Sequence, residues 1–323
     1  MINKSPSVII SVLNWNNFED TIRCVQSLKR LNYTNYEIIL IDNNSIDDSV
    51  SQFRNAFPTI KLVQSKKNLG YAGGHQLVLQ YAFEHGFDLF WILNNDVLVK
   101  QDSLTELVEA YDRHGEAIYG SLTLEIDEET VRFGGGREIL NGHVDHSSPY
   151  NKFHGRKLTD CVSEITEREV SDVNGSSILL SLQLIKKYGF MDTSYFLYFE
   201  EVAYCYRLRM EYHISSIIVP SSLVIHEGSV SFRRSRDLDF VETYYRKRNQ
   251  KIFAKQFFKK PVLGKKKFNT LKTLAKFFLR HSFLSQNKKN FEYWQTYYTN
   301  LAVFHAFLGI KGKYLEPNDF LER

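Results

Sequence analysis

VIISVLNWNN, residues 8–17, is the stretch that decides the fold. Its first six residues carry apolar side chains on both alternating faces, which is typical of a strand covered by helices on two sides. Apolar runs of this kind alternate with helical periodicity up to residue 122, and this alternation predicts an α/β fold with a mostly parallel, Rossmann-like sheet. The expected strands are 8–13, 36–41, 60–64, 88–93 and 117–122, and the expected helices are 21–31, 47–57, 72–84 and 103–114.

The composition is that of an ordinary globular protein. The 323 residues are 43% hydrophobic and 24% charged, with 6 prolines, which excludes collagenous, disordered and disulfide-scaffold proteins. The net charge of +4 conceals an imbalance, because residues 241–323 hold 18 Lys and Arg against 5 Asp and Glu. We therefore expect an acidic body over 1–240, with halves 1–122 and 123–240, and a basic, aromatic, helical region after it. Gly, Asp, Ser and His are frequent in 125–170, which predicts an irregular insertion with short strands.

The cysteines and the apolar runs indicate the cellular compartment in which we expect the protein. Cys24, Cys161 and Cys205 are far apart, which favours a reducing, cytoplasmic setting over a disulfide framework or a CxxC metal site. The N-terminal apolar run lacks a signal-peptide cleavage pattern, and no stretch reaches the roughly 18 apolar residues of a membrane span. We therefore expect a chain that does not cross a bilayer.

Polar residues follow the predicted strands at their carboxyl ends, where open parallel sheets bind ligands. Each such motif alone is more typical of a turn or a helix N-cap, but recurrence at consecutive strand ends favours a site. An acidic residue after the second strand can accept hydrogen bonds from a ribose or a base, and one after the fourth suits a hard divalent cation that carries diphosphate oxygens. The residues concerned are Asn14, Asp42, Asn94, Asn95 and Asp96.

NLGYAGG, residues 68–74, follows the third predicted strand and opens a helix. Its glycines allow close approach of the backbone, and we expect free N–H groups there for an anionic ligand. The segment is not a GxGxxG fingerprint, and its place after the third strand is wrong for one. A dehydrogenase is therefore disfavoured.

Two later positions carry side chains that suit metal binding or general base catalysis. His226 follows the apolar run 217–225, where it could add an imidazole ligand to the metal, or could be a hydrogen-bonded histidine at a strand end. Glu200 and Glu201 lie in an aromatic setting on the way into a helix and are candidates for a general base with a raised pKa. Favourable acidic charge at a helix N-terminus is the alternative interpretation.

Seven motifs in this order resemble the family 2 glycosyltransferases, inverting enzymes of the GT-A fold, and among them bacterial rhamnosyltransferases and related cell-surface polysaccharide transferases. They are SVLNWNN, EIILIDNNSIDDS, NLGYAGG, WILNNDV, VNGSSILL, FLYFEEVAYCYR and VPSSLVIHEGS, and the resemblance covers about residues 7–249. It implies that Asp96, in the family's DxD-like position, and His226 hold Mn²⁺ or Mg²⁺, and that Glu201, with Glu200 beside it, is the base. The residues expected around the nucleotide sugar are Asn14, Asp42, Asn68, Gly70, Gly74, Asn94, Asn95 and Arg248, the last in a family Arg-Asn element.

The segment around the base departs from the family pattern. The family has Glu-Asp-x-Asp where this chain has Glu200-Glu201-Val202-Ala203, so one carboxylate arm is longer by a methylene and the second Asp is lost. A misplacement of about 1 Å can cost roughly 10²-fold in rate, which leaves a non-catalytic sugar-nucleotide or glycan-binding relative as an alternative. A nucleotidyltransferase is another, but it would have a basic glycine-rich loop where this chain has residues 14–17.

The resemblance implies metal-dependent inverting transfer of one sugar from a nucleotide-diphosphate donor, dTDP-rhamnose or a UDP-hexose, to a glycan or lipid-linked saccharide. Single transfer is favoured because the Gln-x-x-Arg-Trp element of processive synthases is absent. In residues 268–284 apolar positions recur at helical spacing among basic residues, which fits an anionic membrane surface as well as a helix packed on the body. We expect a cytoplasmic protein, with peripheral membrane attachment left open, and no nucleic-acid partner, because no recognised module accompanies the basic charge.

Overall fold

The computed structural model describes residues 5–136, 138–140, 143–145, 153–226, 235–260, 262 and 291–321. These residues divide into two compact units. Unit 1 consists of the described residues within 1–138, 145–193 and 200–231, and unit 2 of those within 139–144, 194–199 and 232–323. Our boundary after residue 240 stays a prediction.

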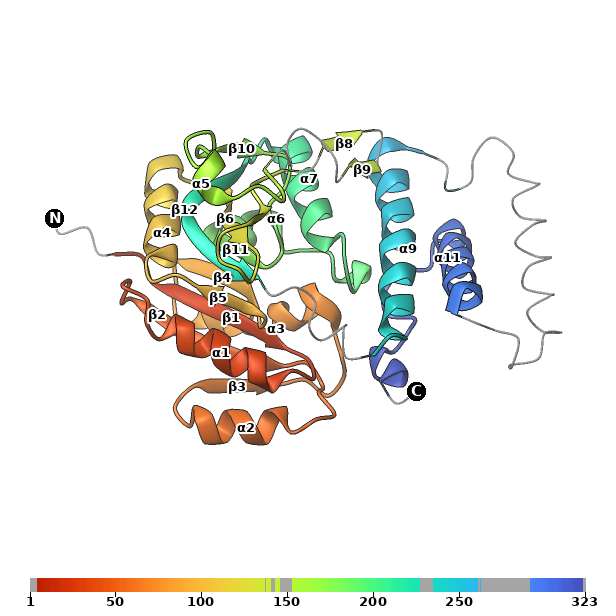
Figure 1. Cartoon of the computed structure of the whole chain (residues 1–323), viewed down its shortest axis with the longest axis horizontal. Helices are drawn as coiled ribbons and strands as arrows, with labels where there is room; N and C mark the ends of the chain where they lie inside the picture. Colours follow the sequence, from red (N-terminus) through yellow and green to blue (C-terminus); the bar gives the residue numbers. More distant parts are fainter. Residues whose placement is uncertain are drawn as a thin grey trace. The chain divides into compact units, whose positions relative to one another are not determined.

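Unit 1 is an α/β body (Figure 1). Its strands are β1 (Val8–Asn14), β2 (Tyr36–Asp42), β3 (Lys61–Gln64), β4 (Leu89–Asn94), β5 (Val97–Val99), β6 (Ile118–Leu124), β7 (Val131–Phe133), β10 (Arg168–Val170), β11 (Ser177–Ser181) and β12 (Ser216–His226). Its helices are α1 (Phe18–Leu28), α2 (Ser49–Ala56), α3 (Gly70–Glu84), α4 (Ser103–His114), α5 (Leu158–Cys161), α6 (Leu182–Tyr188) and α7 (Glu200–Tyr212). Two elements lie mostly in unit 2 although their ends belong to unit 1: a separate two-stranded sheet of β8 (Glu138–Leu140) and β9 (His143–Asp145), and a 3-10 turn, η2 (Thr193–Tyr195), before α7 in the chain. Every strand and helix expected up to residue 122 is present, with ends shifted by a few residues.

The main sheet has the strand order β10-β12-β6-β11-β4-β1-β2-β3. Its β3, β2, β1 and β4 are parallel, as predicted. Strand β11 lies between β4 and β6 and is antiparallel to both, whereas β12 runs parallel to β6. The sheet is therefore mixed, and β6 is not a neighbour of β4. The pattern of residues 8–122 could not indicate this, because the intervening strand comes from much later in the chain.

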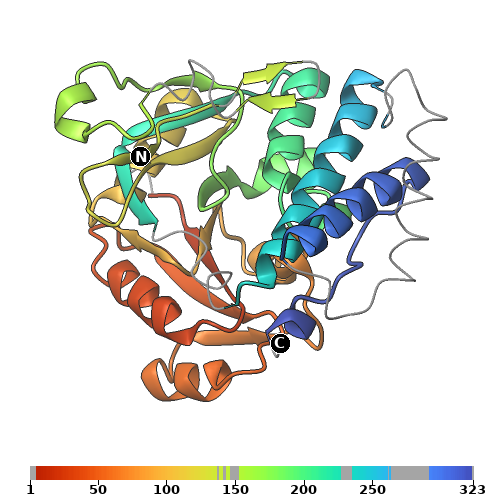
Figure 2. The same ribbon diagram turned by 45° about the vertical axis from the view of Figure 1, so that its right-hand side comes forward.

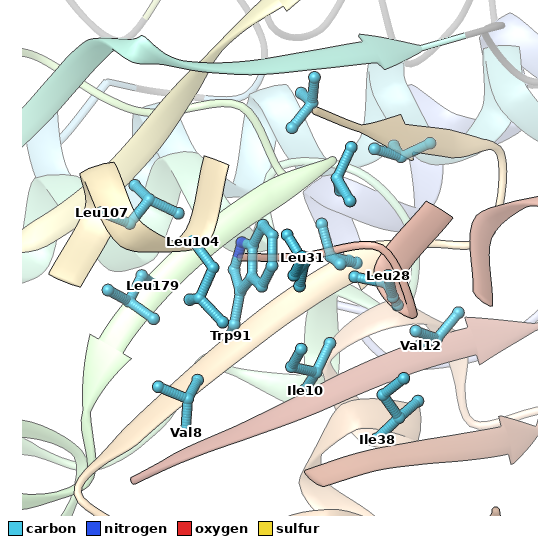
Figure 3. Close-up of a cluster of buried hydrophobic side chains, with 14 of the residues drawn as sticks. Val8, Ile10, Val12, Leu28, Leu31, Ile38, Trp91, Leu104, Leu107 and Leu179 are labelled. Atoms are coloured by element: carbon cyan, nitrogen blue, oxygen red, sulfur yellow. The ribbon is translucent and has the colours of Figure 1, made fainter. Parts of the chain in front are cut away.

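Two hydrophobic clusters lie on opposite faces of β1. Val8, Ile10 and Val12 pack in the cluster drawn in Figure 3, which also contains Trp91 and residues of α1 and α4. Ile9 belongs to the second cluster, with residues of α3, α6 and α7. Neighbouring strand residues point to opposite faces, and each such aliphatic side chain contributes about 1.5–3 kcal/mol when it is removed from water. The prediction that helices cover β1 on both faces is therefore confirmed.

Unit 2 is mainly helical in its described part. Helices α9 (Leu238–Phe258) and α11 (Phe291–Leu308) lie side by side (Figure 2), and η4 (Pro317–Phe320) follows. The ring of Phe240 stacks on that of Tyr298 with centroids 5.4 Å apart, and the Tyr244 hydroxyl is 2.7 Å from Nδ1 of His305. None of the helices in the described ranges has both the length and the apolar content of a membrane span. The amphipathic helix expected at 268–284 lies outside the described residues.

Candidate active site

The carboxyl ends of β1 and β2 form the centre of a hydrogen-bonded network. Asn14 lies directly opposite Asp42 in the parallel register of the two strands, and both are buried. The Asn14 Nδ2 donates to Asp42 Oδ1 at 3.2 Å and to Ser45 Oγ at 3.0 Å. The Asn14 Oδ1 accepts from Thr21 Oγ1 at 2.8 Å. Strand register therefore brings two predicted nucleotide-binding side chains into direct contact.

The end of β4 joins the same network. The Nδ2 of Asn95 is 2.9 Å from Thr21 Oγ1 and 3.3 Å from Asn14 Oδ1. This contact arises because β4 is the parallel neighbour of β1 and ends at the same edge of the sheet. Asn94, the last residue of β4, is half-buried, and its N–H donates to the Ser176 carbonyl at 3.1 Å. The predicted polar residues of three strands thus gather at one edge.

Asp96 and His226 are adjacent in space although they are far apart in the sequence. The His226 Nε2 lies 3.2 Å from Asp96 Oδ1, and both residues are buried. Antiparallel pairing of β12 with β5 places His226 opposite Val97, the residue that follows Asp96. Burial raises the pKa of Asp96, but the charge and contact of His226, with smaller help from a backbone N–H and Arg132, outweigh burial and lower that pKa below its ordinary value. Asp96 is therefore an ionised carboxylate at neutral pH.

A carboxylate oxygen beside an imidazole nitrogen is a suitable pair of ligands for a divalent cation. Neither ring nitrogen of His226 forms a hydrogen bond of good geometry with the described residues, so the ring has no competing bond in that part of the chain. The described ranges contain no cluster of three or more His, Cys, Asp or Glu able to hold a metal. The pair Asp96 and His226 therefore fits a cation that takes its remaining ligands from phosphate oxygens and water, as Mg²⁺ commonly does.

Glu200 and Glu201 are the first residues of α7, Glu200 buried and Glu201 half-buried. A Cβ built on Gly175 would lie 3.5 Å from the Tyr71 hydroxyl and 3.7 Å from Glu201 Cγ, so these residues converge. Tyr71 donates its hydroxyl hydrogen to the Gly175 carbonyl. Burial first, and then the charges of Glu201 and Glu200, raise the pKa of Tyr71 well above its ordinary value. Tyr71 is therefore a neutral hydrogen-bond donor beside Glu201.

A short backbone path connects Glu201 to the metal-ligand pair. Gly175, next to the Glu201 side chain, is followed in the chain by Ser176. The Ser176 carbonyl accepts the hydrogen bond from Asn94, two residues before Asp96. The candidate base and the candidate metal ligand are thus at two ends of one connected group within unit 1.

The NLGYAGG segment is held by amide side chains. The Asn43 Nδ2 donates to Asn68 Oδ1 at 3.1 Å and to the Gly70 carbonyl at 3.0 Å. The N–H of Leu69 donates to Asn43 Oδ1, and the N–H of Gly70 to Asn68 Oδ1, each at 2.9 Å. Our expectation of free N–H groups is therefore wrong for these two amides. The φ of 73° at Gly70 explains the glycine, because other residues rarely adopt this conformation.

Two of the predicted binding residues are engaged in other contacts. A Cβ on Gly74 would lie 2.4 Å from Leu13 Cδ1, so this glycine allows α3 to pack closely against β1. Arg248 is on α9 in unit 2 and is fully buried. Its guanidinium donates to the carbonyls of Tyr195 at 3.0 Å and Gly312 at 2.6 Å. These bonds argue against our expectation that Arg248 contacts the nucleotide sugar, and a donor contact of Gly74 stays a prediction.

Comparisons with known proteins identify the family of this chain. The family described as glycosyl transferase family 2 matches residues 7–166, about half of the chain, which include β1 to β4 and their polar ends. This chain belongs to that family. The hexosyltransferase Agl10 of low-salt glycan biosynthesis in Haloferax volcanii is 23% identical to this family 2 glycosyltransferase over 252 residues, which are 77% of this chain and 75% of the relative.

Solved structures share its GT-A fold. GalNAc-T7 with UDP, GalNAc and Mn²⁺ has a TM-score of 0.56 at 14% identity, over 77% of this chain and 51% of that chain. The mannosyltransferase PcManGT from Pyrobaculum calidifontis, in complex with GDP-Man and Mn²⁺, has a TM-score of 0.55 at 12% identity, over 95% and 87%. Residues 1–349 of S. aureus TarS give 0.50 at 12% identity, over 93% and 81%. The chain spans about half the length of GalNAc-T7, and at these identities the likeness shows the fold alone.

Several further residues of this glycosyltransferase contact the predicted site residues, although sequence reasoning did not single them out. Asn43, Ser45, Tyr71 and Gly175 lie within the motifs DNNS, NLGYAGG and VNGSS, so their place inside a motif was a signal. Thr21 bonds to both Asn14 and Asn95, but it lies in the first turn of α1 and no motif marks it.

Proposed function

We propose that this glycosyltransferase moves a single sugar, with inversion, from a nucleotide-diphosphate sugar to a saccharide hydroxyl. The observation that carries the proposal is the connection, within unit 1, of Glu201 through Gly175 to the strand end that bears Asp96 and His226. Agl10 is named a hexosyltransferase, and PcManGT and GalNAc-T7 were solved with GDP-Man or UDP and with Mn²⁺. These relatives support hexosyl transfer, and dTDP-rhamnose and UDP-hexoses are the donors that we propose to test first.

Glu201 is the proposed general base, with the buried Glu200 as the alternative. The Glu201 carboxylate takes the proton of the acceptor hydroxyl while that oxygen forms a bond to C1 of the donor sugar. The bond from C1 to the diphosphate oxygen breaks on the opposite side, and its electron pair leaves with the nucleoside diphosphate. Tyr71 stays protonated next to Glu201, so it adds no second negative charge there.

Asp96 and His226 are the proposed holders of Mn²⁺ or Mg²⁺. A divalent cation bound there supplies positive charge against the departing diphosphate. The Asn14–Asp42 pair would orient the nucleotide through the hydrogen-bonding groups that remain at the sheet edge, with Asn94 and Asn95 beside it, as the resemblance implies.

The proposed acceptor is a glycan or a lipid-linked saccharide of cell-surface polysaccharide synthesis. The 18 Lys and Arg against 5 Asp and Glu in residues 241–323 favour an anionic membrane surface, where lipid-linked acceptors reside. Co-sedimentation of the full chain with vesicles tests this part. Binding to anionic but not neutral vesicles is expected, and equal behaviour with both contradicts peripheral attachment.

Turnover and donor binding together test the site. With Mn²⁺ and the preferred nucleotide sugar, Glu201→Gln should lower kcat by roughly 10²–10⁴-fold, while the donor still raises the unfolding temperature because binding to the folded state remains. Asp96→Ala should abolish both the turnover and the Mn²⁺-dependent part of that temperature shift. Glu211→Gln, an exposed substitution on the same helix, and Asp112→Asn, exposed on α4, are matched controls that should change neither.

Each other outcome has a definite meaning. Undiminished turnover in both Glu201→Gln and Asp96→Ala contradicts the assigned site. A donor-dependent temperature shift without any turnover in the unmodified chain favours the non-catalytic relative.

A further inference from the structure

The turn that leads into α7 has an unusual backbone. Phe196, Tyr198 and Phe199 have φ values of 69°, 66° and 75°, in the left-handed region that ordinarily suits glycine. For an L-residue with a side chain this conformation costs about 1–2 kcal/mol, and bulky residues adopt it rarely. The turn is directly followed by Glu200 and Glu201. Strain of this kind persists only where surrounding groups hold it, and such sites are often functional.

Asn249 holds this turn by its backbone carbonyls. Its Nδ2 donates to the carbonyl oxygens of Tyr195 at 2.8 Å, Leu197 at 2.7 Å and Tyr198 at 2.8 Å. A side-chain amide has two N–H hydrogens, so three acceptors within reach means that one hydrogen is shared. All three acceptors belong to the left-handed turn, and no described residue outside it receives a hydrogen bond from this amide nitrogen.

Arg248 fixes the orientation of Asn249. The Arg248 Nε donates to Asn249 Oδ1 at 3.0 Å, which assigns the amide oxygen to the arginine and the amide nitrogen to the turn. Arg248 also donates to the Tyr195 carbonyl, and through Nη1 to Gly312. Its guanidinium carbon lies 4.8 Å from the Tyr245 ring centroid and 5.4 Å from that of Tyr244, a distance typical of a cation–π contact.

Burial of the Arg248 guanidinium costs desolvation free energy, so we expect this residue to have a specific role. Arg248 and Asn249 are both fully buried, and within the described part of the chain no carboxylate forms an ion pair with Arg248. Removing a charge from water without a counter-charge is unfavourable unless hydrogen bonds satisfy it. Here three acceptors satisfy the guanidinium: the Tyr195 carbonyl at the turn, the Oδ1 of Asn249, which itself binds the turn, and the Gly312 carbonyl outside it. Two of the three therefore connect this charge to the turn.

We infer that Arg248 and Asn249 are positioning residues, which hold the turn 195–199 with Phe196, Tyr198 and Phe199 in the left-handed conformation and thereby set the start of α7, the helix that bears Glu201. The inference rests on the proposed role of Glu201 as the base. Both residues and the turn belong to unit 2, and the peptide bond from Phe199 to Glu200 carries the constraint to α7.

Asn249→Ala tests the inference when kcat is measured per folded molecule, well below the unfolding temperature. Loss of the three hydrogen bonds should lower kcat by about fivefold to 30-fold, the equivalent of one or two kcal/mol, with the KM for the donor unchanged. Gln256→Ala is the matched control, since this exposed amide on the same helix accepts a hydrogen bond from the Tyr195 hydroxyl, at 3.4 Å, and does not hold the turn by its backbone carbonyls. A kcat equal to that of the unmodified chain, with only a lower unfolding temperature, would overturn the inference.

Two variants of the turn itself provide a second test that leaves the buried pair intact. Tyr198 is half-buried; valine there strongly disfavours a positive φ, whereas glycine adopts it readily. Tyr198→Val should therefore have a lower kcat than Tyr198→Gly, although both lose the ring. In the Asn249→Ala background, Tyr198→Gly should recover part of the lost kcat. Equal kcat values for the two turn variants, or no recovery, contradict the inference.

Glu201→Gln separates this inference from the proposed function. If Glu201→Gln alone leaves kcat unchanged, the proposed base is wrong, whatever Asn249→Ala does. If Glu201→Gln lowers kcat, Asn249→Ala should add little in the Glu201→Gln background, because both changes act through one carboxylate. Fully additive losses would overturn the positioning role while leaving the base in place.

Discussion

The sheet edge of unit 1 and the turn before α7 hold their polar groups by different means. At the sheet edge, side chains from neighbouring strands bond to one another, as Asn14 does to Asp42 and Asn95 does to Asn14. In the turn, backbone carbonyls are held by Asn249, a side chain from a helix that comes much later in the chain. Strand register aligns the side chains at the sheet edge, whereas the carbonyls of the turn need hydrogen bonds from a separate helix. A side chain at the end of a sheet strand is therefore held in place by the core. A side chain at the start of a helix that follows a loop requires other residues to hold that loop.

The largest effect should follow from removing the centre of the sheet-edge network. Asn14→Ala removes one hydrogen-bond partner from each of Thr21, Asn95 and Asp42, although Thr21 and Asn95 keep the bond to each other. A buried polar atom that is left unsatisfied costs about 1–3 kcal/mol. We expect the free energy of unfolding, measured in urea, to fall by at least about 2 kcal/mol, and the affinity for the donor to fall with it. Asn32→Ala, at an exposed asparagine whose side chain bonds to Asp102, should change both little.

Donor binding should distinguish the sheet edge from the turn before α7. Asn14→Ala should weaken donor binding, whereas Asn249→Ala should lower kcat with donor binding preserved. Similar losses of donor affinity in the two variants would mean that the regions do not differ in the way that we propose.

A smaller effect is expected from the packing glycine beneath the sheet edge. In Gly74→Ala the new Cβ would meet Leu13 Cδ1 at 2.4 Å, and overpacking of this kind costs about 1–3 kcal/mol. Gly73→Ala is the comparison, because its closest contact is 3.0 Å, to Leu69 Cβ, and both changes gain the same helix propensity of about 1 kcal/mol. Urea denaturation should rank Gly74→Ala clearly below Gly73→Ala in stability. The reverse order would show that α3 can move away from β1.

The smallest effect is a pH dependence from a histidine beside β1. His75 is buried, its Nδ1 is 2.8 Å from Ser11 Oγ, and burial lowers the pKa of His75 to about 3. Between that pH and the unfolded pKa of about 6.5, the unfolded chain binds a proton that the folded chain does not, so stability falls as pH falls, by up to about 1.4 kcal/mol per pH unit.

His75→Gln should remove this slope, which unfolding in urea at pH 7 and pH 5 would measure. His85→Gln, at an exposed histidine that follows the same helix, should keep the slope of the unmodified chain. If the free energy of unfolding changed with pH by the same amount in all three proteins, this would contradict burial of a neutral His75. It would indicate that water reaches this face of β1.

Much of the fold was predictable because its signals are local. The apolar faces of β1 and β2, the helices between the strands and the polar residues at the strand ends all follow from short patterns, and the structure has them in place. The place of β11 between β4 and β6 was not predictable, because pairing between distant segments leaves no periodic mark. The occupied amides of Leu69 and Gly70 were missed for a similar reason, since one of their acceptors, on Asn43, comes from the β2 end.

The amino-acid order alone was sufficient for the α/β class, the family resemblance and a set of polar residues at strand ends, because hydrophobic period and motif spacing are properties of neighbouring residues. Tertiary structure decided which of those residues meet. The pairing of β12 with β5 brings His226 to Asp96. The approach of Gly175 links Tyr71 with Glu201, and the buried Arg248 bonds to the Tyr195 carbonyl at the strained turn. These contacts join segments far apart in the chain, and only the packed core brings them together.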